Sequence, residues 1–516
     1  MKTTPQPAAD QPPSSAAMNL LIAASCGTAI IVGLLWGTSI PLGVPAEWVW
    51  ERLPADAQSV PNLMLAVFAA AAYLLFVSLG ERRLSRPATT TREVATWLGG
   101  LGIAAFIWLW TVQDTAPLEG QLGKAPFVLY YPGSSGYFTH ARYESTTPAE
   151  LLRGYETLLK RGNVLHEGTH PPGLILVFQA LIALVDAQPW LIEVLSSTEP
   201  ESVHDALDVI AENAARTAQP LQPADRAVLW LATLLTLVAA AATVWPLYQL
   251  LGVTLNRSVA WIGAAAWPAV PAVAIFLPKS DAIFPLIACG ALVVLAISVR
   301  HRSAWRGAVA GLVLFLGLFC SLAFLPILLF GALGVFVLAI RRAGWKQGII
   351  ESLPTVIGVA VGLSLPVIFL RVFYGVNMLT VWAWNYHNHA GFYGQFTRTY
   401  WQWLFVNPLE LAIAVGVPVA VTVWWGWPRR WRCREWTTAD CLTVIAAGVW
   451  GLLWLSGKNA GEAARLWVLL MPGAVWIAAH GFERSALSSR WRWVWLALQL
   501  VACILTVHRV AGFHLG

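Results

Sequence analysis

Long apolar stretches are the feature that most constrains the fold of this 516-residue chain. Several of them run for roughly 18 or more residues with few or no charges, which is enough helix to cross about 30 Å of hydrocarbon. Only 12% of the residues are charged, whereas soluble domains carry roughly 25%. A transmembrane β-barrel would instead show short segments of alternating hydrophobicity. The sequence therefore predicts an all-α polytopic membrane protein.

We expect about 13 transmembrane spans, with boundaries good to a few residues. They cover approximately 18–43, 61–79, 95–112, 226–251, 258–277, 282–299, 306–322, 323–340, 349–372, 409–427, 439–456, 466–481 and 492–508. Residues 1–17 are rich in Pro, Ala and Ser and are expected to form a disordered cytoplasmic tail. The first span is long for the apolar region of a signal peptide, so we expect it to stay uncleaved.

Basic residues gather in a few loops and predict the topology, because cytoplasmic loops carry an excess of Lys and Arg. The segment 113–225 contains one apolar helix, at about 171–185, that is short for a span. If this helix crossed the membrane, every later basic loop would lie outside the cytoplasm. We therefore expect it to be juxtamembrane or re-entrant, and 113–225 to be one large extracytoplasmic loop. The later basic clusters are "VRHRSAWR" (299–306), "RRAGWKQ" (341–347), "PRRWRCREW" (428–436) and "ERSALSSRWR" (483–492).

Charge and cysteine content argue against a nucleic-acid-binding protein and against a protein built on disulfides or cysteine metal sites. The net charge of +6 comes from scattered loop residues, so we expect no nucleic-acid partner. The six cysteines lie in predicted spans or beside basic loops, so we expect no disulfides. Their spacing does not match a CxxC metal site, and the sequence predicts no metal ligand.

Unusual polar stretches share the face that this topology places outside. They are "QDTAPLEG" (113–120), "YYPGSSGYFTHARYE" (130–144), "HEGTHPPG" (166–173), "LPKSDAIF" (277–284), "WNYHNHAGFYGQFTRTYWQW" (384–403) and "SGKNAGEAARLW" (456–467). Each has a structural alternative: Asp114 could be a solvated helix end, and Glu462 with Arg465 could be an i,i+3 ion pair. Charged groups beside hydrocarbon are costly and tend to be functional. Because so many converge at one interface, we expect a site built from several loops.

These elements resemble the GT-C glycosyltransferases, which include protein O-mannosyltransferases and lipid A aminoarabinose transferases. In that family an outward helix ends in an acidic residue, and a large loop with juxtamembrane helices follows. Here Asp114 takes the acidic position, "SSGYFTHARYE" leads to the first juxtamembrane helix, and "THPPGLILVFQAL" opens the second. "FLPKSDAIFPLIA" resembles a later family element. The likeness covers roughly 95–300, with "GEAARLW" matching more weakly.

The resemblance implies a domain plan and a reaction. Spans in 18–94 would be an N-terminal addition, 95–300 the catalytic core, and 301–516 the helices that complete the site. The enzyme would lie in the inner (plasma) membrane and move a sugar from a polyprenyl-phosphate donor to an unidentified extracytoplasmic acceptor. The resemblance leaves the need for a divalent cation open and implies no other cofactor. The alternatives are a transporter or flippase for a lipid-linked or small polar substrate, and a non-catalytic assembly subunit.

The resemblance also implies roles for individual residues. Asp114 would act as the catalytic base, although threonine follows it where the family often has a second acid, and Glu47 in "VPAEWVWER" is the alternative. Arg465, oriented by Glu462, would hold the leaving phosphate. The remaining candidate substrate-binding residues are Lys279 and Arg142 for the phosphate, His170 and Tyr137 for sugar or acceptor, and His166 and Asp281 lining the site.

Overall fold

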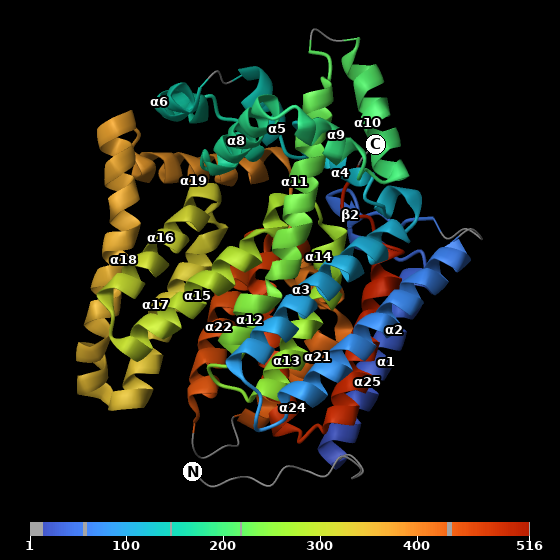
Figure 1. Cartoon of the computed structure of the whole chain (residues 1–516), viewed down its shortest axis with the longest axis vertical. Helices are drawn as coiled ribbons and strands as arrows, with labels where there is room; N and C mark the ends of the chain where they lie inside the picture. Colours follow the sequence, from blue (N-terminus) through green and yellow to red (C-terminus); the bar gives the residue numbers. More distant parts are fainter. Residues whose placement is uncertain (1–13, 55–58, 145–146, 217–218, 431–435, 515–516) are drawn as a thin grey trace.

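The computed structural model describes residues 14–54, 59–144, 147–216, 219–430 and 436–514. Within these residues, ten helical segments are long and apolar enough to cross a membrane, or twelve if each of two bent helix pairs is one span. The chain is therefore a multi-pass, all-α membrane protein (Figure 1). Residues 1–13 of the predicted tail, and Cys433, lie outside the described residues; the other five cysteines are free thiols.

The ten continuous segments follow the predicted spans, except that the first helix ends at Gly37 and a strand occupies the end of the predicted span 18–43. They are α1 (Ser15–Gly37), α2 (Ser59–Leu84), α3 (Thr91–Asp114), α11 (Pro223–Ala242) with α12 (Val244–Leu251), α13 (Arg257–Ala266) with η3 (Trp267–Ala269) and α14 (Pro271–Ile275), η4 (Ser280–Ala282) with α15 (Phe284–His301), η5 (Leu322–Phe324) with α17 (Leu325–Ala343), α18 (Trp345–Tyr374), α22 (Thr438–Leu455) and α25 (Ser489–Val507).

Three of the 13 predicted spans take another form. Helix α16 (Ala304–Cys320) has 17 residues and is slightly short for a membrane crossing. Helices α20 (Tyr400–Val415) and α21 (Val417–Arg430) meet at an angle of 115°, and Gly416 between them has a φ of +91° that favours glycine. The predicted span 466–481 is divided into α23 (Ala463–Leu466), η6 (Val468–Leu470) and α24 (Met471–Arg484).

Short helices from the segment 113–225 gather at one end of the bundle, which we call the loop end (Figure 1). Helix α19 (Met378–Gln395) runs across beneath them. The apolar stretch predicted at 171–185 is α8, and it turns by 106° into α9 instead of continuing as a straight span. The short helices are η1 (Leu118–Gly120), α4 (Lys124–Tyr130), α5 (Tyr137–Thr139), η2 (His140–Glu144), α6 (Pro148–Leu159), α7 (His166–Thr169), α8 (Gly173–Ala187), α9 (Trp190–Ser196) and α10 (Glu201–Ala214).

Glycines at a spacing of four bring α16 and α18 into close contact. A Cβ atom added at Gly358 would lie 2.0 Å from the carbonyl oxygen of Ala304, and one at Gly362 would lie 2.0 Å from that of Ala308. On the facing helix, a Cβ at Gly311 would lie 2.3 Å from the oxygen of Val359. Helices in lipid associate through such small residues because lipid supplies little hydrophobic drive.

Opposite the loop end, a buried carboxylate joins three helices. Glu81 in α2 accepts hydrogen bonds from Ser258 and Ser489, both at 2.6 Å, and pairs with Arg492. These partners lie at the start of α13 and α25. A buried charge is tolerated when it is paired and hydrogen-bonded, so the pairing holds these helix ends together.

The sequence did not predict a β-hairpin that follows α1. Strands β1 (Leu42–Val44) and β2 (Trp48–Trp50) pair antiparallel, with Leu42 opposite Trp50 and Val44 opposite Trp48. The C-terminal segment extends this edge, because Arg52 forms a bridge with Val510. The hairpin and this segment together cover one side of the cavity described next.

Candidate functional site

A cavity of about 1210 Å³ lies at the loop end of the bundle. Its wall is assembled from the β-hairpin, α7, α19, the start of α17, the end of α22, the segment 458–470 and the C-terminal residues 512–514. These segments come from both ends and the middle of the sequence. The cavity therefore exists only once the whole bundle has formed.

The cavity has a polar part and an apolar part. Leucines line it from the first two turns of α17 and the last turn of α22, among them Leu325, Leu329 and Leu452. These three side chains are also exposed on the surface of the spans, where a membrane protein meets lipid tails. The polar part contains Glu47, His166, His170, His389, Arg398, Lys458, Glu462 and Arg465.

Arg465 is a cation on the cavity wall, and its side chain is 13% exposed. Its Nη2 donates a 2.8 Å hydrogen bond to Glu462, and its Nε has no hydrogen-bond partner. Burial lowers the pKa of Arg465, but the nearby Glu462 and Asp281 carboxylates raise it by more. The pKa is therefore above its usual value, and the side chain stays charged. The structure confirms that the i,i+3 ion pair forms, and it leaves one guanidinium donor free.

Lys279 lies near Arg465 but does not line the cavity, and it is 2% exposed. Its ammonium donates to the carbonyl oxygen of Ser134 and lies 3.2 Å from Nε2 of His166. Burial and, to a smaller extent, the positive charge of Arg465 lower the pKa of Lys279 to about 7, while the Asp281 carboxylate acts in the opposite direction. A lysine with this pKa can change its charge near neutral pH.

His166 and His170 lie at the two ends of the one-turn helix α7 and contact Tyr137. The ring centroid of Tyr137 lies 6.1 Å from that of His166 and 5.9 Å from that of His170. Burial lowers the pKa of His170 to about 3, so its imidazole is neutral and can either donate or accept a hydrogen bond.

Neighbouring helices hold the backbone of this turn in place. Tyr155 from α6 donates its hydroxyl to the carbonyl oxygen of His170 at 2.7 Å. Asn385 from α19 donates to the carbonyl oxygens of Gly168 and His170 at 3.0 and 2.9 Å. The polar stretch 384–403 therefore contains a residue, Asn385, that holds α7 in position.

Seven of the nine predicted site residues come together around the cavity. Tyr137, His166, His170, Lys279, Asp281, Glu462 and Arg465 line it or interact with the residues that do.

The two other predicted residues, Asp114 and Arg142, do not line this cavity. Asp114 is the last residue of α3 and is exposed. Arg142 pairs with Asp186 and Asp225, both at 2.8 Å, and so ties η2 to α8 and α11. Arg142 as phosphate ligand and Asp114 as catalytic base both stay predictions.

Glu47, the alternative base, does line the cavity from the hairpin turn. It accepts hydrogen bonds from the backbone N–H of Thr399 at 2.8 Å and from Trp403 at 2.7 Å. Burial raises the pKa of Glu47, but the hydrogen bonds from Thr399 and Trp403 and the charge of Arg398 outweigh it, so the pKa is below its usual value. Glu47 is thus ionised at neutral pH.

Sequence reasoning missed Arg398 and Glu410. The guanidinium of Arg398 stacks over Trp48 and donates to the carbonyl oxygen of Glu47 at 3.0 Å. Glu410 is buried in α20 and accepts hydrogen bonds from the indole of Trp50 and from the backbone N–H of Ala464, next to Arg465. A single acid in the apolar stretch "NPLELAIAV" was a signal for it, because an acid there needs a partner.

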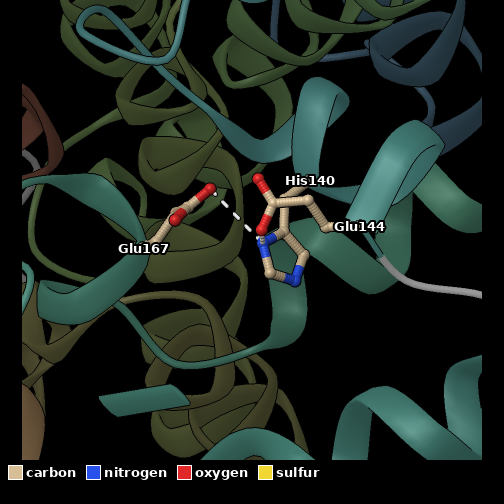
Figure 2. A group of neighbouring side chains, drawn as sticks. All are labelled: His140, Glu144 and Glu167. Atoms are coloured by element: carbon tan, nitrogen blue, oxygen red, sulfur yellow. Dashed lines mark ion pairs between the residues drawn. The ribbon is translucent and has the colours of Figure 1, made fainter. Parts of the chain in front are cut away.

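One group of side chains near the cavity has the donor set of a metal site. His140, Glu144 and Glu167 each turn one ligand atom toward a common point (Figure 2). Glu167 lies in α7 between the two histidines of the cavity. His140 and Glu144 lie in one helical turn, but Glu167 comes from a different short helix, so the sequence alone does not bring the three together.

No known protein-family model and no curated protein sequence matches this chain significantly. Its function therefore has to be inferred from the geometry of the cavity.

Proposed function

We propose that this protein is a membrane glycosyltransferase of the GT-C type, which transfers a sugar from a polyprenyl-phosphate donor to an acceptor outside the cytoplasm. The observation that supports this most is the composition of the cavity, where Arg398, Lys458 and Arg465 lie beside exposed leucines at the ends of two spans and the buried Lys279 lies near Arg465. A lipid-linked phosphate needs both, because its head is anionic and its tail is apolar.

Arg465 is the residue that best fits the donor phosphate. Arginine binds phosphate through two parallel N–H donors, and Arg465 is charged with one donor unpaired. Lys279 would add a second cation behind it. Leu325 and Leu329 on α17 and Leu452 on α22 would contact the first units of the lipid tail.

The reaction would be an in-line displacement at the anomeric carbon. The acceptor oxygen forms a bond to that carbon as the bond to the phosphate oxygen breaks, and the lipid phosphate leaves with the electron pair. The hydroxyl proton passes to a carboxylate, and Glu47 is better placed for this than Asp114 because it lines the cavity. His170 and Tyr137 would contact the sugar.

A transporter or flippase is the second candidate, supported by the leucines that connect the cavity to the lipid-facing surface. Transporters commonly place their substrate site near the middle of the membrane between repeated halves. Here the charged groups of the cavity gather at the loop end, which favours the transferase.

The test is to supply purified protein in lipid nanodiscs with a polyprenyl-phosphate-linked sugar and to measure released polyprenyl phosphate. We expect turnover that Arg465→Ala reduces by about 10²–10³-fold, the usual loss when one donor to a developing negative charge is removed. Arg465→Lys should recover part of the rate, since lysine keeps the charge but not the planar fork.

Arg371→Ala is the matched control, because Arg371 is an exposed arginine near the loop end of α18 and does not line the cavity. It should turn over at the wild-type rate. If the wild type moves the intact donor across proteoliposomes without cleaving it, the transporter is the correct function. If Arg465→Ala turns over normally, the phosphate lies elsewhere.

A further inference from the structure

His140, Glu144 and Glu167 converge on one point beside the cavity (Figure 2). The Nδ1 atom of His140 lies 3.3 Å from a carboxylate oxygen of Glu144 and 3.3 Å from one of Glu167. All three ligand atoms lie within 4.8 Å of one another. The first two residues are the ends of η2, a single π-helical turn. Such turns often occur at functional sites.

Hydrogen bonding does not account for this arrangement. The imidazole is 4% exposed, and its Nδ1 is buried without a hydrogen-bond partner. A single ring nitrogen carries at most one proton and could satisfy only one of two carboxylates. Two carboxylates that face each other also repel. A cation between the three atoms would remove both problems.

The geometry fits a small divalent ion. Zinc binds imidazole nitrogen and carboxylate oxygen at about 2.0–2.2 Å with tetrahedral angles, which separates neighbouring ligand atoms by roughly 3.3–3.5 Å. Both nitrogen–oxygen distances here are 3.3 Å. Calcium and magnesium prefer oxygen ligands alone, whereas imidazole suits transition metals. We propose that His140, Glu144 and Glu167 form a binding site for a divalent transition-metal ion of the zinc class.

The site would position the cavity floor without contacting the donor. Glu167 follows His166 directly and precedes His170 by three residues in α7. A metal held by Glu167 and by η2 would fasten this turn to the segment that carries Tyr137. The side chain of Glu144 is 52% exposed, so water can reach a fourth coordination position.

His204 also lies near two carboxylates, but in the arrangement of ordinary surface ion pairs. His204 is 59% exposed and meets two carboxylates through different nitrogens, Glu199 at Nδ1 and Asp208 at Nε2. Arg226 already neutralises Asp208 with a 2.7 Å contact. These groups do not converge on one point, so His204 is a matched control.

The experiment uses the full-length protein, purified with a tag that contains no histidine and stripped of metal with a chelator. Zn²⁺ is titrated by calorimetry, and the melting temperature is measured with and without Zn²⁺. We expect one bound zinc that excess Ca²⁺ or Mg²⁺ does not displace. His140→Ala and Glu144→Gln should each weaken binding at least about tenfold, and His204→Ala should not.

Glu144→Gln keeps this proposal open to refutation, because the substitution is isosteric and the side chain is half exposed, so the variant should fold. Zinc should raise the melting temperature of the wild type and leave that of Glu144→Gln unchanged. Absence of stoichiometric zinc binding by the wild type overturns the site. So does zinc binding that His140→Ala and Glu144→Gln retain, since the ion would then sit on other histidines.

Discussion

At the scale of single residues, two conservative substitutions distinguish Glu47 from Asp114 as the catalytic base. Glu47→Gln should lower turnover by about 10²–10⁴-fold, the usual contribution of a general base, because the amide cannot accept the proton. Asp114→Asn should stay near the wild-type rate, since Asp114 does not line the cavity. The measurement is release of polyprenyl phosphate at saturating donor.

Glu150→Gln is the control for the first substitution. Glu150 lies in the first turn of α6 at the same end of the bundle, is exposed and does not line the cavity. It should leave turnover unchanged. Loss of activity in Asp114→Asn together with normal activity in Glu47→Gln would return the role of base to Asp114.

Lys279 predicts a pH dependence of donor binding. Burial lowers its pKa to about 7, so the ammonium is present below that value and is lost as the pH rises through it. The groups that interact with it are His166 at 3.2 Å, Arg465, Asp281 and Glu462. We expect the affinity for a phosphodiester-linked lipid sugar to fall between about pH 6 and pH 8, because Arg465 alone keeps its charge.

Lys279→Arg should bind the same donor with little change over this range, because arginine stays protonated. The dissociation constant is measured by calorimetry at several pH values. An equal slope in both proteins would assign the titration to another group. Without ligand, the unfolded chain holds more protons than the folded chain between about pH 7 and pH 10, so burial of Lys279 should make stability rise with pH there.

At the scale of elements, the contact between α16 and α18 depends on missing side chains. Gly358→Ala places a methyl group 2.0 Å from the carbonyl oxygen of Ala304. Because both helix backbones must then move apart, we expect a loss of about 1–3 kcal/mol, seen as a lower melting temperature in detergent.

Gly448→Ala in α22 is the matched control, because its added Cβ meets no atom within 4 Å. Alanine favours a helix over glycine by about 0.5–1 kcal/mol, so this variant should be at least as stable as the wild type. Equal melting temperatures for both variants would mean that the two helices separate at little cost. The spacing of four between Gly358 and Gly362 is visible in the sequence, but the sequence does not say which helix they meet.

At the scale of the whole molecule, the orientation in the membrane remains a prediction from the basic loops. Ser196 in α9 and Arg490 in α25 are both exposed and lie in segments predicted on opposite sides. In a variant without native cysteines, Ser196→Cys should react with an impermeant maleimide added to intact cells, and Arg490→Cys should react only after permeabilisation. The reverse pattern would invert the topology and place the cavity on the cytoplasmic side.

Much of the candidate site could be inferred from sequence, because a charged side chain next to a membrane-spanning segment costs free energy unless it has a partner or a function. Lys279, Asp281 and Arg465 sit beside long apolar runs, and the cavity region does collect them. Arg142, in the polar stretch 130–144, was also a candidate, but it pairs with Asp186 and Asp225. The sequence shows where a charged residue lies, but only the tertiary structure shows which residue it pairs with.

The spans and their order follow from the sequence alone, because hydrophobicity over one membrane thickness is a local property. Ten of the 13 predicted spans are therefore continuous candidate spans in the structure, whereas the broken helix at Gly416 and the short helix α16 depend on local backbone geometry and packing. The cavity was not foreseeable in the same way. Glu410 supports both Trp50 and Ala464, residues 360 and 54 positions away. Contacts over such distances arise only when the bundle closes, since many chain arrangements satisfy the same local pattern and packing selects one of them.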